Sequence, residues 1–266
     1  MDRLPMAELF AGELRRLRVA AGLSQEALAG QIKYSASLVA AVEQCRRPPQ
    51  RDFTEQCDTA LRADGLLLRI REAIMQESLM PWFREWVAIE QDATALRSFE
   101  ALVVPGLLQT EGYARAVLGE GGRLAGDEVE QGVGARLARQ AILDRPNPPL
   151  LVAVLDYTVL ERPIGGPKVM QEQLLHLVEM AHRPKIHLYV VPRSVGAYAG
   201  LSGTFVIATS PGGDEIAWID HQVKGTIVER PGDVLTLRET WESLRAEAMP
   251  HRQSVTTISE AAKTWT

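Results

Sequence analysis

The chain has few of the residues that cross-link a fold or bind a structural metal. Only two cysteines, Cys45 and Cys57, occur among 266 residues, and they form no C-x-x-C pair. Two cysteines cannot build a disulfide framework for a chain of this size, and this pattern is not typical of a zinc site. We therefore expect two reduced thiols, and we predict no metal.

Long apolar segments are also lacking. The longest apolar run, LLVAVL, is far shorter than the roughly 20 residues that cross a bilayer. The N-terminus, MDRLPMAELF, has an acid at its second residue and no apolar run behind Arg3, unlike a secretion signal. We therefore expect a cytoplasmic protein that does not contact a membrane.

The patterns of familiar catalytic sites do not occur. Ser202 stands in GLSG, which lacks the G-x-S-x-G spacing of a nucleophile elbow. His176, His182 and His187 are six and five residues apart, so they do not share a helix face as metal ligands would. We predict no catalytic residue and no cofactor, and we expect that the protein is not an enzyme.

Charge is unevenly distributed along the chain. The composition, 46% hydrophobic and 24% charged, is ordinary for a globular protein, and the net charge is −5. Residues 1–51 hold eight Lys or Arg and five Asp or Glu, so the remainder carries about −8. A locally basic end on an acidic body is suited to bind a polyanion at that end only.

The N-terminal part has the periodicity of short helices. Phe10, Leu14, Leu17 and Ala21 follow one another at spacings of four, three and four, and Gly22 ends that helix. Ser24 and Ser35 are typical N-caps for a second helix that runs to about Ile32 and a third that ends before CRRPPQ. Two more helices are predicted at about 53–63 and 66–78.

The second and third helices have the spacing of a helix-turn-helix. Such a motif needs a small residue where its helices cross and apolar residues on the inner faces. Ala29 is the small residue, and the inner set is Leu28, Ile32, Tyr34, Leu38 or Val39, and Val42. A small helical bundle with the same spacing is the alternative.

This segment resembles the lambda-repressor/Cro-like (XRE) helix-turn-helix family, whose members often have SQxxLA, then S, then IE followed by G, R and P. The resemblance implies binding of double-stranded DNA, with a homodimer as the expected form. The residues that it implies in DNA contact are Gln25, Ser35, Ala36, Ser37, Ala40, Gln44, Arg46 and Arg47.

Three departures weaken the prediction of base reading. Lys33 stands where the turn usually has Gly, and Cys45 replaces the usual Gly after the third helix. Ala36 and Ala40 have neither donor nor acceptor and offer only methyl contact with thymine. Specificity would then come from Ser37, Gln25, Gln44, DNA shape or two copies on a palindrome.

The pattern changes after residue 80. Trp82, Trp86, Ile89 or Glu90, and Ala93 share a face of a helix that we expect to stop near Val104-Pro105-Gly106, and a shorter helix is predicted after Thr110 as its cap. The glycine-rich segment 119–134 is predicted to be a flexible loop with about one turn of helix, and helix resumes until Pro146. From residue 150, LLVAVLD, IHLYVV, GTFVIAT and EIAWID are predicted strands, and helices are predicted at 167–184 and 233–248.

An aromatic and acidic cluster stands on the helix after residue 80. Trp82, Trp86 and Glu90 are four residues apart, so they share one face. This face either lines a small-molecule pocket or is covered by the core or a domain junction. Arg139 and Gln140 either form buried polar links to that helix or bind a ligand.

The resemblance extends over nearly the whole chain. WFREWVAIE, SFEALVVPGLLQTEGYARAVL, ARLARQAILDRPNPPL and GAYAGLSGTFVI resemble the C-terminal domain of actinobacterial WhiJ-like regulators. That group implies an XRE domain joined to a domain of poorly defined biochemistry, often encoded beside a small acidic partner protein. Tyr157, Glu161 and Asp220 depart from the group's usual acid, base and Glu, which weakens any shared ligand or catalytic role for these positions.

We therefore predict an α+β multidomain protein that regulates transcription. Residues 1–79 form an all-α, five-helix helix-turn-helix domain, residues 80–149 a helical linker region, and residues 150–266 an α/β domain with a small mixed sheet. The C-terminal domain would sense a small-molecule ligand or a partner protein. The alternatives are an enzyme or small-molecule binder that has lost DNA reading, and a protein-interaction module.

Overall fold

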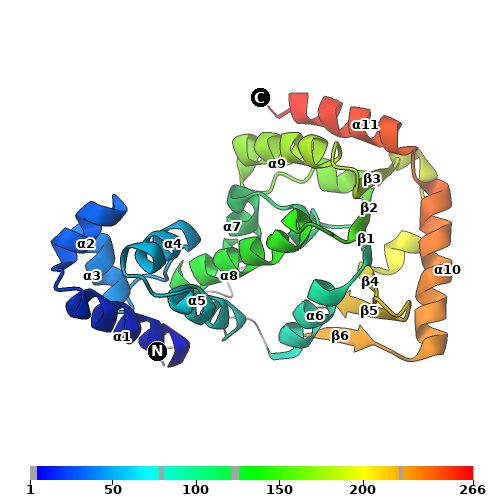
Figure 1. Ribbon diagram of the computed structural model, residues 1–266. Coiled ribbons are helices and arrows are strands. Elements are labelled where there is room, and N and C mark those ends of the chain that lie inside the picture. The colour runs from blue at the N-terminus through cyan, green and yellow to red at the C-terminus, as the bar shows by residue number, and fades with distance from the viewer. Residues whose placement is uncertain (1–4, 78–80, 121–125, 222–223, 266) are drawn as a thin grey trace. The chain divides into compact units, whose positions relative to one another are not determined.

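The computed structural model describes residues 5–77, 81–120, 126–221 and 224–265 (Figure 1). The chain divides into two compact units. Unit 1 comprises Met1–Met80 and Gly122–Ala135, and unit 2 comprises Pro81–Gly121 and Arg136–Thr266. Helix α8 (Gly126–Arg139) has its first ten residues in unit 1 and its last four in unit 2.

Unit 1 is a small all-helical core. Its other helices are α1 (Pro5–Ala20), α2 (Gln25–Ile32), α3 (Ala36–Glu43), α4 (Arg51–Ala60) and α5 (Leu66–Glu77). Helix α1 packs against α5 and α3, and α4 packs against α2 and α5. Phe10, Leu14, Leu28, Phe53 and Leu67 are almost completely buried between them. The five helices predicted for this part are confirmed, although α4 starts and ends a few residues earlier than expected.

The early end of α4 has a local cause. Arg62 and Asp64 have positive φ values of 50°, and Gly65 follows at 74°. The Asp58 carboxylate accepts hydrogen bonds from the backbone N–H groups of Gly65 (2.7 Å) and Leu67 (3.0 Å). The positive φ of Arg62 is incompatible with a continued helix, so α4 ends before residue 62. The Asp58 carboxylate then stabilises the turn that leads into α5.

Unit 2 is built on one mixed six-stranded sheet with the order β3-β2-β1-β4-β5-β6. Its strands are β1 (Ala95–Glu100), β2 (Leu150–Asp156), β3 (Ile186–Val191), β4 (Phe205–Thr209), β5 (Glu215–Asp220) and β6 (Gly225–Val228). Strands β1, β2 and β3 are parallel, whereas β4 pairs antiparallel with both β1 and β5, and β6 pairs antiparallel with β5. The α+β fold class that the sequence predicted is confirmed.

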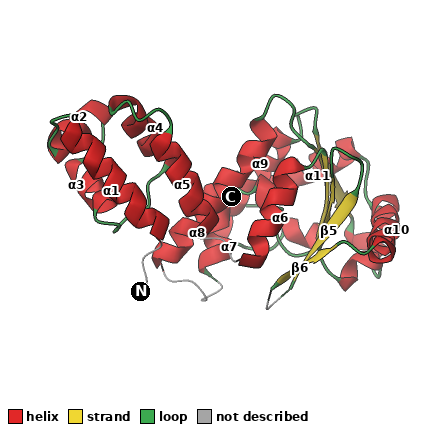
Figure 2. Ribbon diagram, turned by 60° about the horizontal axis from the view of Figure 1, so that its bottom comes forward, coloured by secondary structure: helices red, strands yellow, loops and turns green. Residues whose placement is uncertain are grey.

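Helices cover both faces of this sheet (Figure 2). One face packs against α6 (Pro81–Asp92), α7 (Glu111–Gly119), α9 (Gly166–Met180) and α11 (His251–Lys263) through a core that includes Trp86, Tyr113, Leu174 and Ile258. The other face packs against α10 (Pro231–Glu247), which contributes Trp241 and Leu244 to a smaller core. Short 3-10 segments connect these elements: η1 (Gly106–Leu108), η2 (Gln140–Asp144), η3 (Tyr157–Leu160), η4 (Arg193–Val195) and η5 (Ala199–Ser202).

Two predictions for residues 80–149 are wrong. The helix expected to continue toward Val104 ends at Asp92, and residues 95–100 form β1, a central strand between β2 and β4. The sequence ALRSFE contains good helix formers, but its pairing on both edges outweighs that local preference. The region is therefore not simply a helical linker, because it supplies a strand to the core of unit 2.

The flexible loop predicted at 119–134 is also wrong from Gly126 onward. Residues 126–139 are helical as α8, although three glycines lie within the helix, and residues 121–125 fall outside the described residues. Val129 and Val133 are buried in α8 at a spacing of four, so apolar burial outweighs the glycine content. The sequence reading also did not predict β6 or α11.

Strand β3 lies at an edge of the sheet, and the chain around α11 covers it. The Val190 N–H donates to Ser254 Oγ (3.0 Å), and the Val190 carbonyl accepts from the Met249 N–H (2.9 Å). The Leu188 N–H lies 3.2 Å from His251 Nδ1. An exposed strand edge can pair with another chain, and these contacts close this part of the edge.

Candidate nucleic-acid interface

Helices α2 and α3 have the local geometry of a helix-turn-helix. Ser24 caps α2 by accepting a hydrogen bond from the Ala27 N–H (3.1 Å), and Ser35 caps α3 by accepting from the Leu38 N–H (3.2 Å). Between them, Lys33 has the left-handed conformation with φ 59°. A residue other than glycine in this conformation costs about 1 kcal/mol. The turn is therefore formed as the motif requires, with strain at Lys33.

The inner faces of the two helices are apolar as predicted. Leu28, Ala29, Ile32, Val39 and Val42 are all at most 3% exposed. The alternative between Leu38 and Val39 is decided for Val39, because Leu38 is only half-buried. Tyr34, which was predicted in the inner set, is instead 37% exposed.

A buried polar network joins α1, α2 and α3. Arg18 donates to Glu43 through Nε (2.6 Å) and Nη2 (2.9 Å), and Gln25 Nε2 donates to the same carboxylate (2.7 Å). Burial acts to raise the pKa of Glu43, but the hydrogen bonds from Arg18 and Gln25 outweigh it and lower the pKa. Gln25 is thus anchored at the start of α2, where it buttresses the end of α3.

The outward face of α3 carries small side chains. Ser37, Ala40 and Gln44 follow at spacings of three and four, so they lie on one face; Ser37 and Gln44 are exposed, and Ala40 is half-buried. The hydroxyls of Ser35 and Ser37 are 2.9 Å apart and share a hydrogen bond. Ala36 is half-buried beside them. This face therefore offers one serine and one glutamine as hydrogen-bonding groups on the helix.

Two arginines follow α3 directly. The chain leaves the helix through Gln44 and then Cys45, whose φ is 54°, and the Arg46 N–H donates to the Ala41 carbonyl (2.8 Å). The side chains of Arg46 and Arg47 are exposed, and neither forms an ion pair or hydrogen bond with another residue that the structure describes. Both guanidinium groups are available to an external anion.

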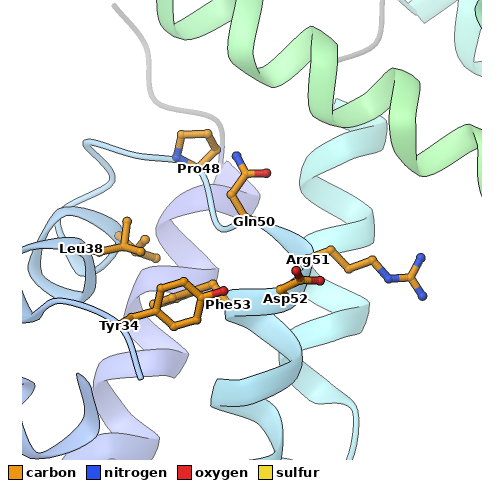
Figure 3. Close-up of a pocket in the computed structure, with 8 residues that line it drawn as sticks. Tyr34, Leu38, Pro48, Gln50, Arg51, Asp52 and Phe53 are labelled. Atoms are coloured by element: carbon orange, nitrogen blue, oxygen red, sulfur yellow. The ribbon is translucent and has the colours of Figure 1, made fainter. Parts of the chain in front are cut away.

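A hollow of about 260 Å³ lies between α3 and α4 (Figure 3). Tyr34, Leu38 and Phe53 line it, and the rings of Tyr34 and Phe53 meet edge to face with their centroids 5.5 Å apart. Leu38 and Val42 face this hollow from α3, whereas Ser37, Ala40 and Gln44 face another direction on the same helix. The hollow thus borders the outward face of α3 and does not include it.

Two of the residues predicted to contact a ligand in unit 2, Trp86 and Glu90, lie in its interior. Trp86 is 1% exposed and stacks on Trp218, with the ring centroids 5.7 Å apart. Glu90 accepts from Arg139 Nε (2.9 Å) and Nη2 (2.7 Å), and the Arg139 guanidinium lies 4.6 Å from the centroid of the Phe83 ring. Trp82 lies in α6, but its side chain falls outside the described residues.

Gln140 also has internal partners. Its Nε2 donates to the carbonyls of Gly106 (3.0 Å) and Gln109 (2.8 Å). Of the two alternatives from the sequence, this geometry matches buried polar links. These hydrogen bonds engage both carboxylate oxygens of Glu90 and the amide nitrogen of Gln140 inside unit 2.

The sequence reading missed a second polar group in unit 2. Gln173 is completely buried, accepts from the Thr110 N–H (2.7 Å) and donates to the Leu108 carbonyl (2.8 Å). Gln109 is 2% exposed, donates to the Val104 carbonyl (2.7 Å) and accepts from Arg136 Nη1 (2.7 Å). The signal available in the sequence was an amide inside the apolar run VVPGLLQT.

Glu100, at the end of β1, is a carboxyl group with a strongly raised pKa. Burial, and to a smaller extent the Asp220 charge, raises its pKa to about 8 against the lowering effects of the Ser98 hydroxyl and Arg136. Burial also lowers the pKa of Arg136 to about 10. Glu100 follows the predicted helical pattern in the sequence, so this environment became visible only with the strand.

The three positions that depart from the WhiJ-like pattern lie at the same end of the sheet: Tyr157 and Glu161 follow β2, and Asp220 is the last residue of β5. Arg193 forms an ion pair with Glu161, and its guanidinium lies 4.7 Å from the centroid of the Tyr157 ring. Asp220 is exposed at the end of β5. Tyr157 and Glu161 thus share one partner, Arg193, from the segment after β3.

Comparison with known proteins finds two family models that match separate parts of the chain. Residues 9–69 match the family model described as Helix-turn-helix domain. Residues 83–260 match the model described as Domain of unknown function (DUF5753), which covers more than half of the chain. The chain belongs to the DUF5753 family. The DUF5753 match contains β1 and all of the sheet, and the helix-turn-helix match contains α2, α3, Arg46 and Arg47.

No curated protein matches the chain, and no solved structure matches it. Two further observations concern the described residues alone. None of their helices is long and apolar enough to cross a membrane. Cys45 and Cys57 form no disulfide within the described chain, and burial raises the pKa of Cys57 to about 12.

Proposed function

We propose that this DUF5753 protein is a DNA-binding regulator of transcription whose helix-turn-helix is of the lambda-repressor/Cro-like type. The observation that carries this proposal is the pair of exposed arginines, Arg46 and Arg47, directly after the outward face of α3 in the matched helix-turn-helix. In such motifs, the helix in the position of α3 enters the major groove, and nearby cations bind phosphates. Contacts of Arg46 and Arg47 with DNA phosphates would then position the domain on the duplex.

Base reading by α3 is expected to be modest. Ala36 and Ala40 can contact only thymine methyl groups, which leaves Ser37 and Gln44 as the hydrogen-bonding readers on this face. A good bidentate contact contributes about 1–3 kcal/mol of discrimination between bases. Ser37 and Gln44 alone therefore provide too little discrimination to select one site among the many in a genome. We therefore expect a homodimer that adds two half-sites on a palindrome.

The second unit supplies regulation in this proposal. Its buried polar groups satisfy one another, so a small ligand or a partner protein would bind at its surface and act on the spacing of two DNA-binding units. The WhiJ-like resemblance supports this division of roles. We further propose that the protein does no catalysis.

Fluorescence anisotropy with the full-length protein tests DNA binding. The probes are duplex DNA from the upstream region of its own gene and a scrambled duplex, titrated from about 50 to 200 mM salt. Each phosphate contact contributes about 0.9 to the slope of log affinity against log salt. Arg46→Ala/Arg47→Ala is expected to lower the magnitude of that slope by about 2 and to reduce the affinity for both duplexes by the same factor.

The matched control is Arg16→Ala/Arg69→Ala, which removes the same charge from exposed positions on α1 and α5. It is expected to change the slope by less than half as much. The proposal is wrong if neither duplex binds, or if Arg46→Ala/Arg47→Ala retains the wild-type salt slope.

A further inference from the structure

Unit 2 has a cavity of about 420 Å³ at the amino-terminal ends of two neighbouring strands. Its walls come from segments 143–149 and 183–186, which lead into β2 and β3. The two segments are tied together, because the Leu151 N–H donates to the Lys185 carbonyl (2.8 Å). A volume of this size falls within the range of small-molecule sites, about 300–1,000 Å³.

The walls of this cavity are rigid. Four of its ten lining residues are prolines, at positions 146, 148, 149 and 184. Each proline has a fixed φ and no backbone N–H, so these segments lose little conformational freedom when a ligand binds. Arg183 adds a cross-brace by donating to the Leu143 carbonyl (3.4 Å) and to Asp144 (2.7 Å). The cavity is thus preformed.

The cavity is positively charged on an acidic unit. Unit 2 contains 17 Lys or Arg and 20 Asp or Glu. The lining nevertheless includes Arg145, Arg183 and Lys185 and no acidic residue. Arg183 is paired with Asp144, but among the described residues Arg145 donates only to main-chain carbonyls, those of Gln91 (2.7 Å) and Ile142 (3.3 Å).

Lys185 is the second cation without a carboxylate. Its side chain is exposed, and it has no ion pair or hydrogen bond with the described part of the chain. Proline rings, Leu143 and Ile186 supply apolar surface next to these two charges. The lining thus combines an apolar wall with two cations that lack a counter-charge.

We propose that this cavity binds a small molecule that joins an anionic group to a flat apolar body. The anion would lie between Arg145 and Lys185, and the apolar body against the prolines. The inference deepens the proposed function, on which it rests, by naming the chemical class of the ligand that unit 2 receives. Arg145 also donates a hydrogen bond to the Gln91 carbonyl near the end of α6. A ligand that binds Arg145 would therefore affect the bond that holds this end of the helix.

The test uses anilinonaphthalene sulfonate, an anionic aromatic dye that fluoresces when it binds apolar sites, with the full-length protein. N-phenylnaphthylamine, which lacks the sulfonate, is the neutral counterpart. We expect saturable binding of one sulfonate dye per chain that weakens with salt, and weaker binding of the neutral dye. Lys185→Glu is expected to raise the Kd for the sulfonate dye about tenfold, because it reverses one charge at the site.

Lys168→Glu is the control, since it makes the same charge change at an exposed position on α9 outside the cavity. It is expected to leave the Kd within about twofold of the wild-type value. A second variant, Asn147→Trp, fills the cavity from an exposed lining position and is expected to reduce dye binding without reversing a charge. Thermal unfolding of each variant identifies any loss of fold.

Wild-type affinity in both Lys185→Glu and Asn147→Trp overturns the inference, as does equal binding of the neutral dye. The same preparations are titrated with duplex DNA. Normal DNA binding without the predicted dye site contradicts this inference alone. A dye site that follows the predictions, in a protein that does not bind DNA, contradicts the proposed function instead.

Discussion

Several of the residues predicted to bind partners have opposite surroundings in the two units. In unit 1, Ser37, Gln44, Arg46 and Arg47 are exposed, and the two arginines have no side-chain partner in the described chain. In unit 2, Trp86 and Glu90 are at most 3% exposed, and Glu90 is engaged by Arg139. A polar pattern in a sequence thus marks either a surface for a partner or a bond inside the fold, and burial distinguishes them.

Each unit also contains one buried arginine–glutamate pair of nearly equal exposure. The side chains of Glu43 and Arg18 are 3% and 10% exposed, and those of Glu90 and Arg139 are 4% and 11% exposed. In unit 1 the pair joins α1 to Glu43, the last residue of α3, which carries the proposed DNA contacts. In unit 2 it stands where the sequence suggested a ligand. The buried arginine–glutamate ion pair therefore has a structural role in both units.

The two units can be followed separately. All five tryptophans, Trp82, Trp86, Trp218, Trp241 and Trp265, belong to unit 2. Tryptophan fluorescence therefore reports the unfolding of unit 2, whereas far-UV circular dichroism also includes the helices of unit 1. Each prediction below uses this difference.

The largest effect is expected at the pair in unit 2. Glu90→Ala leaves the Arg139 charge buried without a partner and should destabilise unit 2 by about 3–5 kcal/mol. Urea unfolding followed by tryptophan fluorescence measures this loss. The double variant Glu90→Leu/Arg139→Leu, which removes both charges, should lose less than the single variant. A single variant as stable as the wild type would leave Glu90 free for a ligand.

The corresponding change in unit 1 is Glu43→Ala. It removes the acceptor of both Arg18 and Gln25, and we expect a loss of about 3 kcal/mol in unit 1. The circular dichroism transition should shift while the tryptophan transition stays in place. Glu13→Ala, which breaks the exposed pair with Arg16, is the control and should cost less than about 1 kcal/mol. A shift of both transitions would contradict the separation of the units.

A change of pH should alter the stability of the two units in opposite directions: Glu43 makes unit 1 less stable at low pH, and Glu100 makes unit 2 less stable at high pH. The folded-state pKa of Glu43 lies below its ordinary value of 4.5, so its contribution is present above that pH and is lost as the pH falls through the lowered pKa. The pKa of Glu100 is raised to about 8 from 4.5. Between these two pH values the carboxyl group is protonated in the folded state and ionised in the unfolded state. Stability from Glu100 is therefore lost as the pH rises from about 4.5 to 8.

Glu100→Gln should remove this loss in unit 2, because glutamine stays neutral at every pH. We expect the variant and the wild type to be alike at pH 4, and the variant to be about 4 kcal/mol more stable at pH 8, with Asp220 and Arg136 unchanged beside it. Tryptophan-detected urea unfolding at the two pH values measures the difference. Equal stability at pH 8 would mean that Glu100 is ionised in the folded protein.

The smallest effect is expected at the turn before α3. Lys33→Gly relieves the left-handed strain at φ 59° and should stabilise unit 1 by about 0.5–1 kcal/mol. Lys33→Ala keeps the strain while removing the same charge, and it should give no such gain. Thermal unfolding by circular dichroism separates the two variants. Equal stability of Lys33→Gly and Lys33→Ala would show that the turn carries no strain.

The sequence predicted unit 1 more accurately than unit 2. The caps at Ser24 and Ser35, the small residue Ala29 and the stop after α3 are local features, and each is visible within a few neighbouring residues. Strand β1 is different, since ALRSFE becomes a strand only because β2 and β4 pair with its two edges. Those partners lie about 50 and 110 residues away, beyond the reach of any local periodicity.

The candidate sites follow the same division. The sequence alone determined that a helix-turn-helix with small outward residues is followed by two arginines, because helical spacing and N-caps are local properties. Only the tertiary structure decided that Glu90 bonds Arg139, that the pKa of Glu100 is raised to about 8, and that segments 143–149 and 183–186 line one cavity. Burial, and with it the pKa and the availability of a side chain, depends on neighbours that are distant in the sequence.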